Sequence, residues 1–217
     1  MPRITAGEKR GLRLSVPPGE RVRPTTDQVR QAIFNILGAR VVGARVLDLY
    51  AGSGALGLDA LSRGAGFALF VDNHPESLLS LQDNLRRAGY AARAQVARGD
   101  ALRPEGWQRH LSGRIDLVFL DPPYGQGLVP ATLAVLATRP WLSENALVVA
   151  EFEAERLRDP LALTPAGPWR PRSPRHYGGT AVGWWEHVPP TLPMNSPTPA
   201  REAAMFAAPR DGAERDD

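Results

Sequence analysis

The sequence predicts an α/β protein with a mostly parallel sheet that is covered by helices on both faces. From Gly43 onward, short and continuously apolar stretches alternate with segments of helical periodicity. This alternation is typical of parallel strands that are buried on both sides and joined by helical crossovers. At 217 residues and 43% hydrophobic content, the chain is long enough for one such domain with appendages.

The elements follow in order along the chain. Alternation around glycines predicts a hairpin at residues 4–16, and apolar spacing predicts a helix over 28–37 that Thr26 or Asp27 caps and Gly38 ends. Strands are expected at 45–50, 67–71, 92–96, 115–120 and 146–152, and helices at 55–62, 75–88 and 129–138. A closing antiparallel hairpin is expected at 169–188 around Gly178 and Gly179.

These expected elements divide the chain into three regions. Residues 1–40 form an N-terminal extension of hairpin and helix, and residues 41–188 form the sheet domain. Residues 189–217 are rich in Pro, Ala and charge, so we expect a disordered tail, because such a segment buries little apolar surface.

Composition narrows the possible functions. The chain has no cysteine, and its four histidines lack ligand spacing, so we expect no metal site. Neither a secretory segment nor an apolar run long enough to span a bilayer is present, which favours a cytoplasmic protein. Arginines cluster in 1–30 and in 156–176. A GC-rich gene would explain the excess of arginine over lysine, but the clustering favours contact with nucleic acid.

A glycine loop follows the first strand of the sheet. Gly52, Gly54 and Gly57 form a G-x-G-x-x-G pattern that opens a helix, and such glycines let the backbone approach a ligand closely. The ligand could be a dinucleotide or S-adenosylmethionine (SAM). Asp48, at the strand end, would repel a pyrophosphate but suits the cationic methionine end of SAM. Alternatively, loop amides satisfy this carboxylate, which is compatible with either ligand.

Two further acids follow the next two strands. Asp72 could accept hydrogen bonds from ribose hydroxyls, or it could cap the helix that starts at Pro75. Asp100 could bind an adenine amino group, although a surface turn is an equally good interpretation. Three acids at three successive strand ends favour a nucleoside ligand more than any one of them does.

The fourth strand ends in Asp121, Pro122, Pro123 and Tyr124. An exocyclic amine of a base is a weak nucleophile, and acceptors that hold its N–H groups can aim its lone pair at a methyl group. Asp121 and the Pro122 carbonyl can supply such acceptors, and Tyr124 offers a face on which an extruded base could stack. Alternatively, the two prolines only end the strand and the tyrosine packs into the core.

The chain resembles the RsmD-type bacterial rRNA methyltransferases, and the resemblance runs from Met1 to about Val188. It rests on R-I-T-A-G-E-K-R-G at 3–11, R-P-T-T-D-Q-V-R-Q-A-I-F-N-I-L at 23–37, D-L-Y-A-G-S-G-A-L-G-L-D-A-L-S-R-G at 48–64 and F-L-D-P-P-Y-G at 119–125. The last two motifs occur in many amino-group methyltransferases, whereas the first two are more particular to this family. One departure is Asp72, where relatives often have Glu.

The resemblance implies a Rossmann-like class I SAM-dependent methyltransferase fold with a seven-stranded sheet. It implies methylation of a guanine at N2 in small-subunit (16S) rRNA, within a small ribosomal subunit or an assembly intermediate. The enzyme is expected to be a monomer that uses SAM and releases S-adenosylhomocysteine. The expected cofactor site comprises Asp48, Tyr50, Ala51, Gly52, Ser53, Gly54, Asp72, Asn73, Asp100 and Ala101. Catalytic roles fall to Asp121, Pro122, Pro123 and Tyr124, and RNA contacts to Arg3, Arg10 and Arg23.

Three alternatives remain open at this point. An adenine-N6 or other amino-group methyltransferase of DNA or RNA would use the same D-P-P-Y corner. An NAD-dependent oxidoreductase would use the glycine loop but leaves that corner unexplained. A non-catalytic RNA-binding factor could keep the fold, but the intact acids at 48 and 121 argue against a decayed site.

Overall fold

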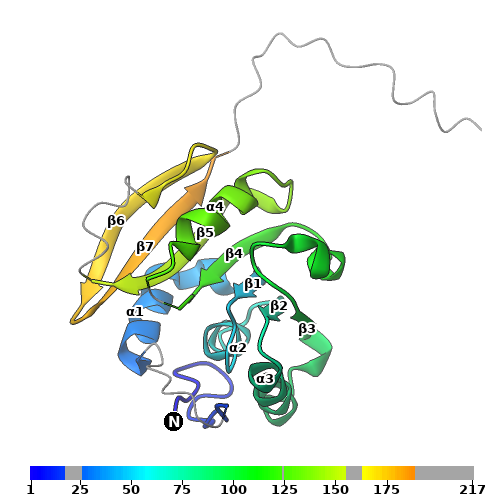
Figure 1. Ribbon diagram of the computed structural model, residues 1–217. Coiled ribbons are helices and arrows are strands. Elements are labelled where there is room, and N and C mark those ends of the chain that lie inside the picture. The colour runs from blue at the N-terminus through cyan, green and yellow to red at the C-terminus, as the bar shows by residue number, and fades with distance from the viewer. Residues whose placement is uncertain (18–25, 124, 155–162, 189–217) are drawn as a thin grey trace, which may run out of the picture.

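The described chain folds around one twisted sheet. The computed structural model describes residues 1–17, 26–123, 125–154 and 163–188. Within these ranges the sheet has seven strands in the order β3-β2-β1-β4-β5-β7-β6 (Figure 1). The strands are β1 (Arg45–Leu49), β2 (Phe67–Asp72), β3 (Ala94–Arg98), β4 (Ile115–Leu120), β5 (Leu142–Glu153), β6 (Trp169–Tyr177) and β7 (Thr180–His187). The first five strands pair in parallel and β7 pairs antiparallel with both β5 and β6, so the predicted mostly parallel sheet is confirmed.

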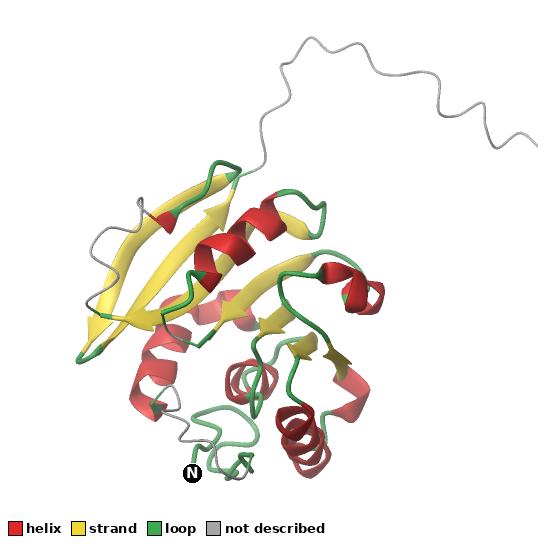
Figure 2. Ribbon diagram, viewed as in Figure 1, coloured by secondary structure: helices red, strands yellow, loops and turns green. Residues whose placement is uncertain are grey.

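Helices cover both faces of the sheet, as the apolar strands predict (Figure 2). The helices are α1 (Asp27–Leu37), α2 (Ala55–Ser62), α3 (Pro75–Ala88) and α4 (Leu128–Ala137). Apolar residues of α1, α2 and α3 share one core cluster with Val46, Phe70 and Phe119 of the strands. Apolar residues of α4 share the other cluster with the alternate strand positions, such as Leu47 and Val118. Strand residues that alternate between two apolar layers explain why the strands read as continuous hydrophobic runs.

The element boundaries differ from the predicted ones where the backbone turns. Strand β1 ends at Leu49 because Tyr50 adopts a left-handed conformation with φ 63°. Strand β3 begins at Ala94 because a short 3₁₀ turn, Ala91–Arg93, precedes it. Helix α1 starts where it was expected, since the Thr26 hydroxyl accepts a hydrogen bond from the Val29 amide at 3.2 Å, and Gly38 ends it.

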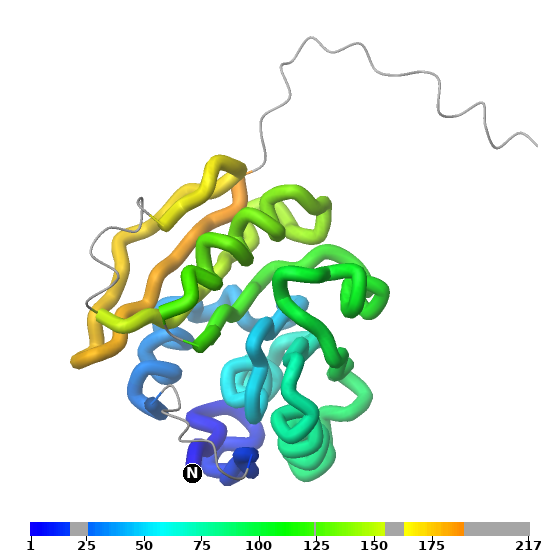
Figure 3. The backbone as a smooth tube through the Cα atoms, viewed as in Figure 1, coloured from blue at the N-terminus to red at the C-terminus, as the bar shows by residue number. Residues whose placement is uncertain are grey.

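The expected N-terminal hairpin is reduced to a closed loop. Only one antiparallel bridge, Arg3 with Arg13, joins its two sides within residues 1–17. Further backbone bonds run between the two sides, from the Ile4 amide to the Leu12 carbonyl at 3.0 Å and from the Leu14 amide to the Pro2 carbonyl at 2.9 Å. The loop lies beside α2 and α3 (Figure 3), and α2 bonds the amides of its turn. The amides of Glu8 and Lys9 donate to the carbonyl and hydroxyl oxygens of Ser62 at 2.9 and 3.0 Å. We call residues 2–17 the N-terminal loop below.

Three expectations concern parts of the chain outside the described ranges. The predicted tail at 189–217 lies there, and so do Arg23 and Tyr124. In the part that the structure describes, no helix has the length and apolarity that a membrane crossing requires.

Candidate active site

Three acids lie at neighbouring strand ends on the carboxyl edge of the sheet. Strands β2, β1 and β4 are adjacent, and Asp48 of β1 is in register with Phe70 on one side and Phe119 on the other. Asp72 and Asp121 each lie two residues beyond those partners. The sheet therefore brings together three of the predicted site residues, as parallel strands bring their carboxyl ends to one edge.

Asp48 is a buried carboxylate among other acids. Its residue is 2% exposed, and one of its oxygens accepts a hydrogen bond from the Gly57 amide at 2.9 Å. Burial raises the pKa of Asp48 well above its ordinary value, the Gly57 hydrogen bond offsets part of that rise, and the charges of Asp121 and Asp72 add to it. A carboxylate in this position is favourable for a cationic ligand and unfavourable for a phosphate.

Asp72, the last residue of β2, binds the glycine loop through hydrogen bonds. One of its oxygens accepts from the Gly52 amide and the other from the His74 amide, each at 2.8 Å. Asp72 does not cap α3, because the N-cap His74 has no side-chain cap bond and Asp72 binds the amide of His74 itself. Contact of Asp72 with ribose hydroxyls stays a prediction. Asn73, the next residue, is exposed.

The glycine loop needs its glycines for two different reasons. A Cβ on Gly54, whose φ is 80°, would lie 2.3 Å from Leu81 Cδ1, and one on Gly57 would lie 2.2 Å from the Phe70 ring. At Gly52, with φ 54°, nothing lies within 4 Å of such an atom, so this part of the loop is open. An open backbone beside a buried acid fits SAM, whose methionine end is cationic, better than it fits a pyrophosphate.

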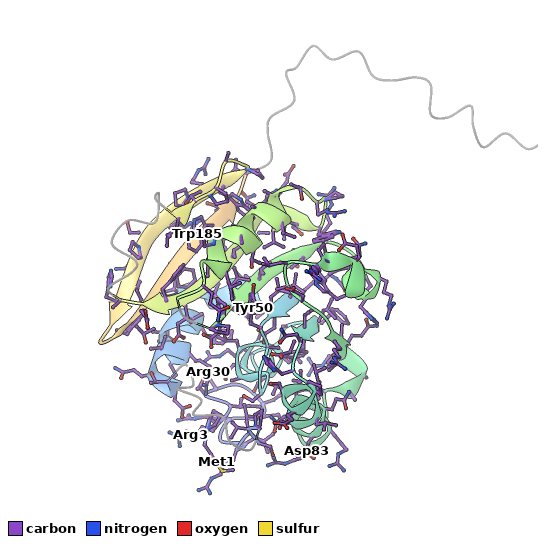
Figure 4. The ribbon with its side chains drawn as sticks, in the orientation of Figure 1. Met1, Arg3, Arg30, Tyr50, Asp83 and Trp185 are labelled. Carbon is purple, nitrogen blue, oxygen red and sulfur yellow. The ribbon has the colours of Figure 1, made fainter. Side chains whose placement is uncertain are left out.

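Tyr50 connects the loop after β1 to α4 (Figure 4). Its hydroxyl lies 2.8 Å from Thr132 Oγ1, and Thr132 also donates to the Leu128 carbonyl at 2.7 Å. Burial raises the pKa of the Tyr50 hydroxyl, the bond with Thr132 offsets part of this, and the Asp100 charge adds to it. Thr132 was not foreseen, because nothing in the sequence pairs it with a residue 82 positions away.

Asp100 lies in a surface turn, which was the alternative to its expected contact with an adenine amino group. Its side chain is 46% exposed, it accepts from the Leu102 amide at 2.9 Å, and it lies 3.8 Å from Arg103. The neighbouring Ala101 is buried. Contact of Asp100 with an adenine stays a prediction.

The corner that follows β4 lies next to the glycine loop. Asp121 is partly buried, Pro122 is buried and Pro123 is exposed. Asp121 is close enough to Asp48 for its charge to raise the pKa of that acid. Tyr124 lies outside the described residues, so its stacking role stays a prediction.

The predicted RNA contacts are exposed where they are described. The Arg3 side chain is 62% exposed although its Nε lies 2.8 Å from an Asp27 oxygen, and Arg10 is exposed. Arg30, which the sequence counts among the arginines of residues 1–30, is not available for contact with nucleic acid. It is fully buried, and it pairs with Asp59 of α2 at 3.0 Å.

A hollow of about 350 Å³ lies at the opposite, amino edge of the sheet. It is lined by residues such as Arg40, Asp116 and Glu144. None of the predicted site residues lines it, so it is unrelated to the carboxyl-edge site.

The sheet order and the loop after β1 define the class I fold of SAM-dependent methyltransferases. An RNA methyltransferase from Salinibacter ruber, solved in complex with S-adenosyl-L-homocysteine, shares this fold with a TM-score of 0.56. At 19% identity, over 79% of this chain and 97% of that one, the likeness establishes the fold alone.

The chain belongs to the RsmD family of rRNA methyltransferases, whose model is described as "Conserved hypothetical protein 95" and matches residues 2–182. It is similar to the "Ribosomal RNA small subunit methyltransferase D" of Escherichia coli K12, with 39% identity over 153 residues, 70% of this chain and 75% of the relative. It is also similar to the solved structure of the Escherichia coli protein yhhF. The TM-score is 0.71 at 35% identity, over 86% of this chain and 97% of the other.

Proposed function

We propose that this protein transfers a methyl group from SAM to the exocyclic N2 amine of one guanine in 16S rRNA. The observation that carries the proposal is the meeting of Asp48, the glycine loop and the Asp121 corner at one edge of the sheet. Family membership supports an rRNA substrate. The choice of guanine N2 rests on the N-terminal motifs that the chain shares with the family.

Cofactor binding would use groups whose places are described above. SAM supplies a methyl group on a sulfonium centre. Asp48, buried and near two other acids, would hold the cationic methionine end, directly or through water. Asp72 would accept ribose hydroxyls with the lone pairs that the Gly52 and His74 amides leave available. The open face at Gly52 leaves room for close approach.

The corner after β4 would hold the target amine. Asp121 and the Pro122 carbonyl accept its two N–H groups, which turns the nitrogen lone pair away from the ring. Pro123 limits the backbone, so little alignment is lost on binding. Asp121 need not remove a proton first, because the amine proton becomes acidic only when the new N–C bond forms, and the carboxylate can accept it then.

The RNA must present an accessible guanine. N2 lies on the minor-groove side of a base pair, so the target base must be unpaired or turned out, and Tyr124 would then stack on it. Arg3, Arg10 and Arg23 would bind backbone phosphates around the site. The enzyme would work as a monomer in the cytoplasm, on the small ribosomal subunit or on a precursor of it.

The test is methyl transfer from tritiated SAM to three substrates: small ribosomal particles, bare 16S rRNA and duplex DNA. We expect N2-methylguanosine in rRNA and no label in DNA. The Asp121→Ala variant should lose about 100-fold in rate because the amine is no longer aligned, yet keep its affinity for S-adenosylhomocysteine. The control is Glu144→Ala, an exposed acid at the opposite edge, which should keep wild-type activity.

Label in adenine rather than guanine would refute the proposal and favour an adenine-N6 enzyme with the same corner. An Asp121→Ala variant with full activity would refute the role of that carboxylate. Tight binding of NADH in place of S-adenosylhomocysteine would refute the assignment of the loop.

A further inference from the structure

Asn84 of α3 is a buried polar residue with no direct role in the proposed binding of the cofactor or the base. It has no exposed surface, and all its described partners are backbone atoms. Its Oδ1 accepts from the Ser15 amide at 2.8 Å, and its Nδ2 donates to the Ser15 carbonyl at 2.9 Å and to the Ser53 carbonyl at 3.0 Å. One side-chain amide thus joins the N-terminal loop to the centre of the glycine loop.

The bond to Ser53 helps to orient a peptide unit of the glycine loop whose amide, that of Gly54, also donates to the Ala51 carbonyl at 2.7 Å. Ser53 stands between Gly52 and Gly54, which both have positive φ, and a peptide flanked by glycines has little steric preference for one orientation. Together with the bond from Gly54 to Ala51, Asn84 stabilises the orientation in which the Ser53 carbonyl points toward α3. Leu81, one helical turn before Asn84, packs where a side chain on Gly54 would otherwise lie, so the same face of α3 supports both residues.

The bonds to Ser15 extend this support to the N-terminal loop. Asn84 holds both backbone groups of Ser15, as a neighbouring strand would. The half-buried Asp83 beside it, labelled in Figure 4, contacts only the hydroxyl of Ser15, at 3.3 Å. Arg87 of α3 also donates to the Arg13 carbonyl at 2.9 Å, but only Asn84, among the described residues of α3, bonds both backbone groups of one loop residue.

We propose that Asn84 is a positioning residue that orients the glycine loop for the cofactor and ties this orientation to the seating of the N-terminal loop on α3. The inference rests on the proposed SAM site but not on the identity of the methylated base. Because the amide bridges both segments, an N-terminal loop seated on α3 favours the binding-competent glycine loop. By reciprocity, cofactor binding favours the seated N-terminal loop.

The test is calorimetry of S-adenosylhomocysteine binding to the full chain. Asn84→Asp is isosteric and keeps an acceptor for the Ser15 amide, but it turns an oxygen toward the two carbonyls. We expect about tenfold weaker binding, since two buried hydrogen bonds are lost and one of them orients the loop. Asn84→Ala should weaken binding similarly.

The matched control is Ser15→Ala. It removes the hydroxyl contacts with Asp83 and Arg87, at 3.3 and 3.1 Å, while both backbone bonds to Asn84 remain. Its affinity for S-adenosylhomocysteine should equal that of the wild type. A second readout is amide hydrogen exchange of peptides that cover 12–16 and 51–56. Both should exchange faster in Asn84→Asp, and both should be protected together when ligand binds the wild type.

Equal affinity of Asn84→Asp and wild type would overturn the inference, as would protection of the glycine loop alone on ligand binding. If the variants do not fold, NMR of the wild type can measure the hydrogen-exchange rate of the side-chain amide protons of Asn84. They should exchange slowly and more slowly still with ligand, whereas fast exchange or no response would contradict the proposal. A wild type that binds no S-adenosylhomocysteine refutes the proposed function itself, so the two failures are distinguishable.

Discussion

The buried ion pair between α1 and α2 gives a quantitative prediction for Arg30→Met. The side chains of Arg30 and Asp59 have no exposed surface, and Arg30 also donates to the Arg3 carbonyl at 2.6 Å and to Asp27 at 2.7 Å. Loss of one partner from a buried pair costs about 3–5 kcal/mol. Asp59 keeps the amide and hydroxyl of Thr5 as donors at 2.6 and 2.9 Å, so we expect the lower end, about 3 kcal/mol.

For a chain of this size, a loss of about 3 kcal/mol lowers Tm by about 6–12 °C. Urea unfolding and thermal scans of the variant measure both quantities. Arg3→Met is the matched control, because its partner Asp27 belongs to the same network but its own side chain is 62% exposed. That variant should lose about 1 kcal/mol or less. Adding Asp59→Asn to Arg30→Met removes the unpaired buried charge, so the double variant should recover part of the loss. A loss for Arg30→Met no larger than for Arg3→Met would refute the reasoning.

Three further predictions concern the site. Burial raises the pKa of Asp48 above its ordinary value of 3.8. Between pH 3.8 and the raised pKa, the folded state therefore binds more protons than the unfolded state. The free energy of unfolding should fall as the pH rises through this range. Asp48→Asn should lose this pH dependence in urea unfolding, be at least as stable near neutral pH, and lose affinity for S-adenosylhomocysteine in calorimetry. Gly54→Ala should weaken the binding of S-adenosylhomocysteine and lower Tm, because the φ of Gly54 is 80° and an added Cβ would lie 2.3 Å from Leu81 Cδ1. A Gly54→Ala variant with the Tm of the wild type would contradict this. Tyr50→Phe removes the 2.8 Å bond to Thr132 and should cost about 0.5–1.5 kcal/mol in urea unfolding, whereas an unchanged midpoint would show that the bond is dispensable.

Local signals were enough to predict most of the fold. The apolar runs placed β4 at its observed bounds, Ile115–Leu120, because a strand buried on both sides needs an uninterrupted hydrophobic stretch. Thr26 and Gly38 marked the ends of α1 because the capping chemistry lies within a few residues of the chain. The N-terminal hairpin was predicted less well. Its two sides do bond to each other, as the Ile4 amide does to the Leu12 carbonyl at 3.0 Å, but they form one regular bridge, and the amides of its turn bond to Ser62 of α2.

Part of the site could also be predicted. Asp48, Asp72 and Asp121 follow strands, and parallel pairing brings strand ends to one edge, so their proximity follows from topology. Arg30 could not be assigned from sequence, because an arginine in a basic segment gives no sign of a buried partner 29 residues away.

The strands, the glycine loop and the acids at the strand ends can be predicted from the sequence, because each depends on neighbours along the chain. Which polar side chains join separate segments becomes visible in the folded structure. Asn84 meets Ser15 and Ser53 across 69 and 31 residues. Such a contact exists only when the crossover helix α3 packs between the N-terminal loop and the glycine loop, and no local pattern encodes that arrangement.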